Sequence, residues 1–577
     1  MHLLSLLIFL PLFASLLVLF LPESQRKTYK YIALIVAIIE FGISFKIYTS
    51  IDFSISSLQL VEQYNWLSLS LGSFGTLSIK YLLGVDGLNY SMVLLTSIVM
   101  LVGTIASWKI SEKVKGYYSL FLLLTASVYG CFLALDFFLF FLFFEFMLLP
   151  MYFLIGIWGG TRREYASIKF FLYTLFGSVF VLIVMVLLGI STVDPVLTAL
   201  NAGFAKDFYL VDEKVIAKVH TLLQSGMFSG VNKHLIVYTL DTRYMMDVKN
   251  IVPDSVLGLV NSFTVFGLHP RLIAFAALMI GFMVKLPAFP FHTWLPDAHV
   301  EAPTPISVVL AGVLLKIGGY GIIRFAYGIF PEGATYFAIH IAIIGLISII
   351  YGAFNALAMK DLKKMIAYSS ISHMGFVLLG LASLTAEGVG GAMYQQFSHG
   401  IISAMLFIIV GVLYDRTHNR NIDDYRGLAS KMPQYTTFTV IAFFASLGLP
   451  GFSGFIAEIF VFLGAFNSQS INGLLPHWIG IVATFGVLLG ATYYLWALQK
   501  MYFGKYWLKG GHEWNEKLTD LSNRELYMLV PLALIAIVLG VLPHLYFDTT
   551  VAFTSEFVKS TLMNAKFNLQ SFHQIFR

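Results

Sequence analysis

Cysteine and charge are both scarce in this sequence. A single cysteine, Cys131, occurs in 577 residues, so the chain has no partner cysteine for an internal disulfide and too few thiolates for an iron–sulfur cluster or a cysteine zinc site. Only 12% of the residues are charged, about half of the roughly 25% that is typical of soluble domains. We therefore expect neither a cytosolic enzyme nor a nucleic-acid-binding protein, and any redox chemistry should reside in another chain.

Hydrophobic residues take the place of the missing charge. They make up 58% of the chain, and the mean hydropathy is +0.81. A helix that crosses a membrane needs about 20 apolar residues, and this supply predicts an all-α polytopic membrane protein with about fourteen transmembrane helices. The predicted helices are Leu3–Leu21, Tyr31–Ile47, Leu88–Trp108, Tyr117–Leu135, Phe137–Trp158, Ile168–Ile190, Leu272–Phe291, Ser307–Phe330, Tyr336–Leu357, Met365–Leu384, Gly391–Leu413, Tyr435–Leu463, Ile479–Leu498 and Leu526–Leu542.

The loop charges predict the orientation of these helices. Basic residues gather in every second short loop, whereas the loops near Asp136, Glu332, Glu387 and Gly473 have almost none. Positive residues stay on the cytoplasmic side of a membrane, so both termini are expected outside. The basic loops are marked by Arg26, Lys27 and Lys30; Lys109, Lys113 and Lys115; Arg162 and Arg163; Lys360, Lys363 and Lys364; Arg416, Arg420, Arg426 and Lys431; and Lys500, Lys505, Lys509, Lys517 and Arg524.

Six titratable residues deep inside the predicted helices are the candidates for a proton path. A charge at the centre of a bilayer costs about 2.5–3.5 kcal/mol even on the mildest scale, so each needs a partner or a watery cavity. A structural explanation is one buried ion pair, with histidines bound to backbone carbonyls. A row of acids, amines and imidazoles at membrane depth is instead what a proton relay requires. The six are Glu145, Lys285, Lys316, His373, His399 and Glu458.

Prolines predict that two of the helices are discontinuous. Pro287 and Pro290 follow Lys285 in the seventh helix, and Pro450 precedes Glu458 in the twelfth. Proline removes a hydrogen-bond donor and clashes with the preceding turn, and freed backbone at that depth is tolerated only within protein or beside water. Matching breaks five helices apart indicate two inverted five-helix repeats, helices 4–8 and 9–13, which is a pointer to a transport site.

These features divide the chain into four parts. Residues 1–115 hold the first three helices, and residues 116–330 hold the first repeat. That repeat contains a long insert of mixed polarity, residues 191–271, expected to be an extracytoplasmic cap of short helices or a hairpin. The second repeat covers residues 331–500, and residues 501–577 hold the last helix and the tail.

Several long motifs carry a family resemblance. With them the chain resembles the antiporter-like proton-pumping subunits of respiratory NADH:quinone oxidoreductase (complex I), and is most similar to the subunit M (chain 4) type. The motifs are Gly84-Val85-Asp86-Gly87-Leu88; Glu145 through Pro150-Met151-Tyr152 to Trp158-Gly159-Gly160; Lys285-Leu286-Pro287; Phe291-His292-Thr293-Trp294-Leu295-Pro296-Asp297-Ala298-His299; Ala302-Pro303-Thr304-Pro305; Asp361-Leu362-Lys363-Lys364; and Ala367-Tyr368-Ser369-Ser370-Ile371-Ser372-His373-Met374-Gly375.

The resemblance implies roles for the six buried residues. Glu145 and Lys285 would be the paired carboxylate and lysine of the family. Lys316 would be the central lysine, and Glu458 would be the exit-side acid. The presence of an acid at position 458 favours the subunit M type. His373 and His399 would lie on the axis between the half-channels. At about 4 Å and a dielectric near 20, a carboxylate and an ammonium attract by about 4 kcal/mol, so opening and closing the Glu145–Lys285 pair would make the lysine release and reload a proton.

The resemblance also implies a setting. The chain would lie in the bilayer of a bacterial inner (plasma) membrane with both termini periplasmic, next to sister antiporter-like subunits. It would pass protons from the cytoplasm outward, with uptake near His292 and His299, driven by quinone reduction elsewhere. The chain itself is expected to hold no cofactor, because FMN, iron–sulfur clusters and quinone would belong to other subunits. Three alternatives stay open: a subunit of a sodium-type cation/proton antiporter, a membrane subunit of a proton-pumping hydrogenase, and a scaffold whose charges only lock helices together.

Overall fold

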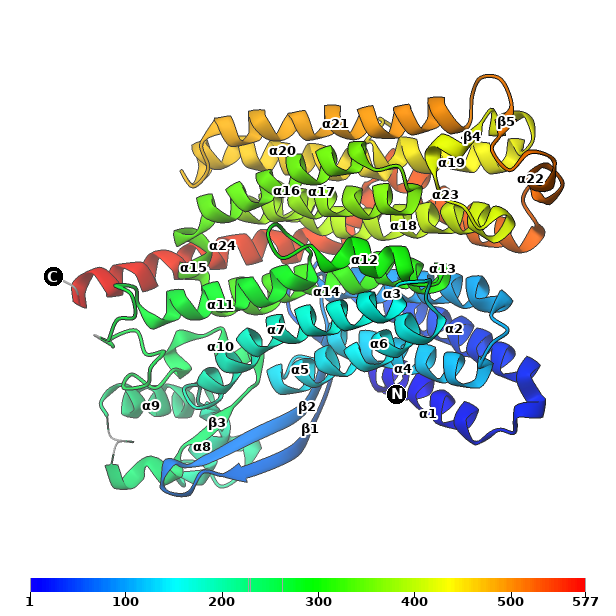
Figure 1. Ribbon diagram of the computed structural model, residues 1–577. Coiled ribbons are helices and arrows are strands. Elements are labelled where there is room, and N and C mark those ends of the chain that lie inside the picture. Colours follow the sequence, from blue (N-terminus) through cyan, green and yellow to red (C-terminus); the bar gives the residue numbers. More distant parts are fainter. Residues whose placement is uncertain (1, 227, 229, 262, 576–577) are drawn as a thin grey trace.

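The computed structural model describes residues 2–226, 228, 230–261 and 263–575. Long helices run side by side and make up most of the molecule (Figure 1). Among the described residues, 13 spans are long and apolar enough to cross a membrane. They are α1 (Leu3–Phe20), α2 (Arg26–Tyr48), α3 (Asn89–Ala106), α4 (Val114–Leu133), the pair α5 (Phe137–Phe146) and α6 (Leu148–Trp158), α7 (Arg163–Gly189), the span from α13 to η8 described below, α16 (Ala338–Ala358), α17 (Leu362–Ser383), α18 (Ala386–Thr417), α20 (Ser453–Ile471), α21 (His477–Met501) and α23 (Asn523–Val541).

Both helices that carry the prolines are interrupted. The predicted seventh helix is α11 (Pro270–Lys285), which ends at Lys285 after 16 residues, followed by a loop and α12 (Trp294–Glu301). This break explains why 13 rather than about fourteen uninterrupted spans are found. The predicted twelfth helix likewise consists of α19 (Pro433–Ser446) and α20, separated by a loop that contains Pro450. In each case the helix ends shortly before a proline, which cannot donate the next backbone hydrogen bond.

The eighth predicted helix lies at the centre of the bundle. It runs through α13 (Thr304–Val309), η7 (Leu310–Leu314), α14 (Leu315–Gly321) and η8 (Ile322–Tyr327), and its most apolar window is entirely buried. The segments η7 and η8 are π-helical. Widened turns of this kind free backbone carbonyls and are frequent at functional sites.

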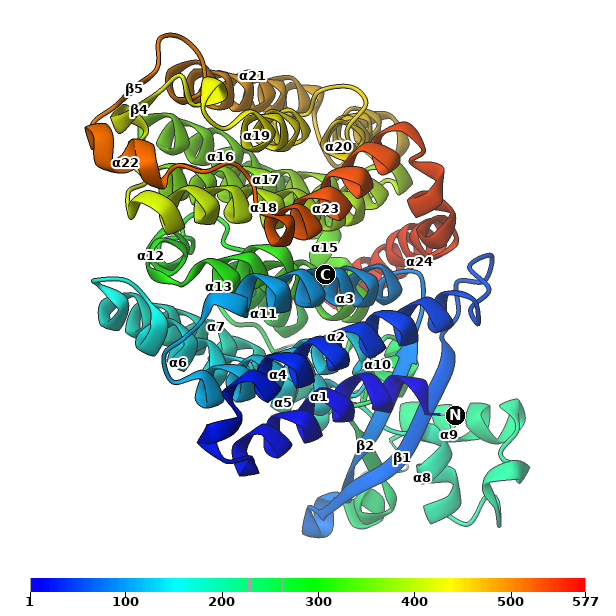
Figure 2. The same cartoon turned by 90° about the vertical axis from the view of Figure 1, so that its right-hand side faces the viewer.

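The expectation of an all-α protein is wrong where two small sheets form. Strands β1 (Gln59–Ser70) and β2 (Thr76–Val85) form an antiparallel hairpin between α2 and α3, and β3 (Val237–Thr239) extends it in parallel. The hairpin projects from the helices (Figures 1 and 2), where a strand can pair with segments other than a membrane helix. Its turn has glycines with positive φ, 65° at Gly72 and 112° at Gly75. A short second sheet pairs β4 (Tyr425–Arg426) with β5 (Trp507–Leu508), near α22 (Gly511–Lys517).

The insert 191–271 folds into short helices against this hairpin. It contains α8 (Pro195–Asn201), α9 (Glu213–Gln224) and α10 (Thr242–Met245), and a small core of its own that includes Val193, Val219, Leu223 and Ile236. We call these residues with β1 and β2 the cap. Instead of forming a separate hairpin, the insert contributes the single strand β3 to the sheet.

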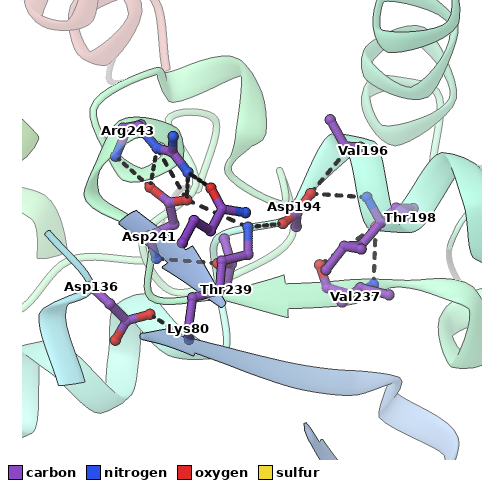
Figure 3. A network of polar contacts seen from close by, with 11 residues as sticks. Lys80, Asp136, Asp194, Val196, Thr198, Val237, Thr239, Asp241 and Arg243 are labelled. Atoms are coloured by element: carbon purple, nitrogen blue, oxygen red, sulfur yellow. Dashed lines mark hydrogen bonds and ion pairs between the residues drawn. The ribbon is translucent and has the colours of Figure 1, made fainter. Parts of the chain in front are cut away.

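Buried charges hold the cap to the hairpin. The Lys80 ammonium on β2 points toward Asp194 and Asp241 (Figure 3), at 2.6 and 3.4 Å. The Arg243 guanidinium binds the same Asp241 carboxylate at 2.6 Å. Asp136, at the start of α5, accepts the backbone N–H of Lys80 at 3.1 Å. The insert is thus tied both to the hairpin and to the helix that carries Glu145.

The tail forms a long helix that crosses the cap side of the bundle. This helix, α24 (His544–Ile575), packs closely against the start of α3. The approach is so close that a side-chain carbon added at Gly87 would lie 2.8 Å from the Thr549 carbonyl. Near its far end, Asn568 donates to Glu332 of α15 (Pro331–Tyr336) at 2.7 Å. It therefore bridges the first three helices and the second predicted repeat (Figure 2).

Candidate proton axis

Lys285 and Glu145 lie at two interrupted helices. Lys285 is the last residue of α11 and is 4% exposed, and Glu145 is half-buried in α5 one residue before the end of that helix. The expected close ion pair is not formed among the described residues. The Lys285 ammonium instead lies 4.7 Å from the ring centroid of Phe144, and Oε1 of Glu145 has no hydrogen-bond partner. The two charges are within electrostatic range of each other without being in contact.

Lys316 is fully buried in the central helix. Its ammonium donates to the backbone carbonyl of Ala311, a residue of the π-helical η7. The same ammonium lies 2.8 Å from Nδ1 of His399 in α18. The widened turn therefore supplies the carbonyl that binds the lysine, and the lysine in turn faces an imidazole.

His399 and His373 continue this line. Their ring centroids are 5.5 Å apart, and between them is a cavity of about 10 Å³ whose lining includes Gln395, Ser398 and Ser446. A space of that size holds roughly one water molecule. His373 is further bound on both ring nitrogens, by the Gln395 amide at 3.2 Å and the Ser446 hydroxyl at 3.3 Å.

Glu458 ends the line at the second helix break. Its Oε1 lies 3.5 Å from Nδ1 of His373. Its Oε2 lies against the loop between α19 and α20, where a side-chain carbon added at Gly448 would come within 2.7 Å of it. Gly448 also has a φ of 77°, which favours glycine. The break thus makes room for the carboxylate.

The six predicted residues therefore form two groups. Lys316, His399, His373 and Glu458 form one continuous line across α14, α18, α17 and α20, whereas Lys285 and Glu145 form a separate pair. The two groups are joined by the close packing of α14 against the end of α11. A side-chain carbon added at Gly318, two residues after Lys316, would lie 2.6 Å from the backbone nitrogen of Leu286, the residue after Lys285. The structure places no direct side-chain contact between Lys285 and Lys316 among the described residues.

A charged cavity of about 710 Å³ lies on the face opposite the cap. At its inner edge, Glu301 and Lys363 are buried, and the Lys363 ammonium donates to the Ala302 carbonyl at 2.6 Å. The sequence indicated a loop position for Lys363, but the residue lies in the first turn of α17. We call this cavity the vestibule; its charged lining includes Lys109, Glu301, Asp361, Lys363, Asp415 and Arg420.

His299 lies behind the vestibule. It is fully buried, its ring stacks on Phe407 with centroids 4.4 Å apart, and neither ring nitrogen has a hydrogen-bond partner among the described residues. It lies within electrostatic range of both Lys363 and Lys316. His292 is also buried with its Nδ1 unpartnered. An imidazole without partners at this position is suited to exchange protons between the vestibule and Lys316.

Sequence reasoning missed several buried ionic contacts. Arg324 of η8 binds both carboxylate oxygens of Asp86, at 2.8 and 2.7 Å, and Arg271 of α11 binds Glu332 at 2.6 Å. The signal for the first was an arginine inside a predicted transmembrane helix, whose cost requires a partner. Among the described residues, no group of three or more His, Cys, Asp or Glu side chains is placed to hold a metal ion.

The fold and the buried line define a class: a polytopic membrane subunit with an antiporter-like arrangement of titratable groups. The sequence model of the family described as NADH:quinone oxidoreductase/Mrp antiporter, TM matches residues 134–231 and 254–485. A subunit of the respiratory complex I of Thermus thermophilus, solved with bound NADH, has a TM-score of 0.72 and 25% identity, covering 97% of this chain and 100% of that one. A chain of the Mrp complex from Dietzia sp. DQ12-45-1b shares the fold, with a TM-score of 0.72 at 18% identity over 97% of this chain and 99% of that one.

Curated relatives with similar sequences identify the family within this class. The NADH-quinone oxidoreductase subunit M of Rhodobacter capsulatus is 36% identical over 95% of this chain and 94% of its own length. The NAD(P)H-quinone oxidoreductase chain 4 2 of Thermosynechococcus vestitus is 37% identical over 95% of this chain and 90% of its own length. The chain therefore belongs to the family of subunit M (chain 4) of NADH:quinone oxidoreductase, as its motifs predict, and is an antiporter-like proton-translocation module of that complex.

Proposed function

We propose that protons cross the membrane in this chain along Lys316, His399, His373 and Glu458. The observation that carries the proposal is the continuity of these four buried groups, each near enough to its neighbour for proton exchange directly or through one water molecule. Amine, imidazole and carboxylate groups can each bind and release a proton, and a buried charge at this depth needs such partners. Lys285 and Glu145 act as a charge pair that loads Lys316 electrostatically.

The vestibule is the proposed cytoplasmic entrance. Its charged lining keeps it wet, and Glu301 and Lys363 lie at its inner edge. Protons pass from there through His299 to Lys316, whereas Glu458 releases them on the cap side. Both termini then face the periplasm of a bacterial inner membrane, as the loop charges predict.

Two inverted five-helix repeats, helices 4–8 and 9–13, frame this path in the proposal. Their support is the matching interruption of α11–α12 and α19–α20 beside Lys285 and Glu458. The proposed units are residues 1–115, 116–330, 331–500 and 501–577. Sister antiporter-like subunits flank the chain, and FMN, iron–sulfur clusters and quinone reside in other subunits, where quinone reduction supplies the drive.

The opened Glu145–Lys285 pair explains how that drive acts. An ammonium beside a carboxylate keeps its proton, whereas a separated, desolvated one loses it. The structure has the separated arrangement, with the ammonium over the Phe144 ring. Movement of charge in a neighbouring subunit would close the pair and make Lys285 reload.

Alanine variants of Glu145 and Lys285 test this mechanism in the intact complex. Each is expected to lower the ratio of protons pumped to electrons transferred, while the complex assembles normally. Lys364→Ala, at a half-exposed position of α17, is the matched control and should leave the ratio unchanged. An unchanged ratio in both Glu145→Ala and Lys285→Ala would contradict the proposed role. A ratio that depends on sodium concentration would instead favour a cation/proton antiporter.

A further inference from the structure

A buried carboxyl outside the proton axis remains without an explanation. Glu40 lies in α2 with 1% of its surface exposed, and its Oε1 has no hydrogen-bond partner. It lies eight positions before the cap-side end of α2 at Tyr48, a depth of about 12 Å along the helix. It therefore lies inside the membrane, and it takes part in no ion pair among the described residues.

The helices around Glu40 offer no compensating cation. Those packed against α2 are α1, α3 and α4. Within these three helices the only basic side chain is Lys115, at the opposite end of α4. The titratable group that faces Glu40 is the hydroxyl of Tyr129, on which its charge acts electrostatically. An ionised carboxylate without a partner in such surroundings is very unfavourable, so the group binds a proton instead.

A series of hydroxyls runs from the next helical turn toward the cap side. Ser44 lies one turn beyond Glu40, and its hydroxyl bonds that of Ser97 on α3. Tyr129 on α4 donates to the Ser97 hydroxyl at 2.9 Å. Tyr90, in the first turn of α3, donates to the Ser44 carbonyl at 3.3 Å and contacts Tyr48, a ring that is 42% exposed. The hydroxyls of Ser44, Ser97 and Tyr129 thus bond to one another in turn, and because hydroxyls both donate and accept, this group can pass a proton. Tyr90 binds the Ser44 carbonyl rather than a hydroxyl, so it extends the polar contacts toward Tyr48 without joining the hydroxyl series.

We propose that Glu40 is a second proton-binding site, which exchanges with water on the cap side through the hydroxyls of Ser44 and Ser97. The ligand is a proton, and Glu40, Ser44 and Ser97 lie on α2 and α3, outside the two proposed repeats. The site does not depend on the proposed axis, because none of its groups contacts Lys316, His399, His373 or Glu458.

Infrared difference spectroscopy on the intact complex tests this site. The wild-type spectrum minus that of Glu40→Gln should contain the C=O stretching band of a protonated carboxylic acid near neutral pH. Glu387→Gln, at a half-buried position in the first turn of α18, is the control and should keep the band. Glu40→Asp retains an acid, so its band should shift rather than vanish, which keeps the test valid if the amide variant assembles poorly.

Isotope exchange tests the route. In heavy water the Glu40 band should shift as its proton is replaced, and this shift should be slower in Ser44→Ala/Ser97→Ala. Carboxylate bands in place of the acid band would overturn the proposal. Loss of the acid band when sodium salts replace potassium salts would also overturn it, because the ligand would then be a sodium ion. Exchange that is equally fast in the double variant would overturn the hydroxyl route. Lys316 variants should not change the Glu40 band. Failure of the Glu40 proposal is therefore distinguishable from failure of the proposed pump mechanism.

Discussion

The ammonium of Lys316 faces Nδ1 of His399 at 2.8 Å, deep inside the helix bundle. A lysine can donate to this nitrogen only while the nitrogen has no proton, so the contact couples the proton occupancy of the two groups. When Lys316 gives up its proton, His399 is the nearest titratable acceptor on the line to His373. In the proposed mechanism, this contact is the step at which a proton leaves the central lysine.

The first prediction separates a titrating lysine from a fixed positive charge. Lys316→Arg keeps the charge but cannot release a proton, because guanidinium stays protonated in proteins. Proton transfer through this chain should fall by about 100-fold or more, measured as pumping by membrane vesicles at a normalised rate of electron transfer. A Lys316→Arg complex that pumps like the wild type would show that only the charge matters.

The second prediction concerns the helix break beside Glu458. Gly448→Ala should displace the carboxylate, because the added carbon would come within 2.7 Å of Oε2. The ratio of protons to electrons should fall, with Glu458 no longer in line with His373. Gly451→Ala is the matched control: it also imposes a positive φ, 97°, on a residue with a side chain, but its added carbon meets nothing within 4 Å. Equal losses in both variants would mean that backbone strain, rather than the position of Glu458, causes the effect.

The sequence predicted the helical framework because its signals were local. Apolar runs of membrane length and prolines beside Lys285 and Glu458 act within one helix, and the structure bears them out in the interrupted α11–α12 and α19–α20. The hairpin formed by β1 and β2 escaped prediction because its strands pair outside the membrane, where length and hydropathy carry little information. The burial of Lys363 escaped for a related reason, since only the packing of α17 against the Ala302 carbonyl distinguishes it from its neighbours in a basic loop.

The contacts within the candidate site were likewise beyond what local sequence signals predict. Composition and motifs marked six titratable residues, but they could not say which of them touch. The separation of Lys285 from Glu145 depends on where α11 ends relative to α5, and the contact of Lys316 with His399 depends on the π-helical turn in η7. Both are consequences of tertiary packing. Glu40 belongs to none of the motifs, and only its burial among helices without a nearby cation distinguishes it.

The third prediction is a pH dependence of the cap. Burial, together with the nearby Asp241 carboxylate, raises the pKa of Asp136 to about 7, from 3.8 for an ordinary aspartate. The folded cap then keeps a proton that the unfolded chain has already lost, so stability is highest below the unfolded pKa and decreases as pH rises toward 7. Asp136 accepts the backbone N–H of Lys80, and Asp241 acts on it electrostatically. The other charged groups of this network are the Lys80 ammonium, Asp194 and Arg243.

The measurement is hydrogen exchange of the backbone of the insert, corrected for its intrinsic dependence on pH. Between about pH 5.5 and 7.5 the wild-type cap should lose roughly 2 kcal/mol of protection. Asp136→Asn keeps a residue that caps the start of α5, and it should show almost no dependence over this range. A dependence of the same size in that variant would show that a group other than Asp136 causes it.

The fourth prediction concerns the buried pair of Asp86 and Arg324. Arg324→Met leaves the Asp86 carboxylate buried and alone, and removal of one partner from such a pair costs about 3–5 kcal/mol. The level of assembled complex and its thermal stability in detergent should both fall. Arg324→Met/Asp86→Leu removes both charges and should recover most of the loss, because apolar side chains replace a buried pair at little cost. Lys109→Ala breaks an exposed pair with Asp415 and should cost no more than about 1 kcal/mol. If the double variant were as unstable as the single one, the guanidinium would be needed for contacts other than Asp86, such as the Tyr320 hydroxyl at 3.3 Å.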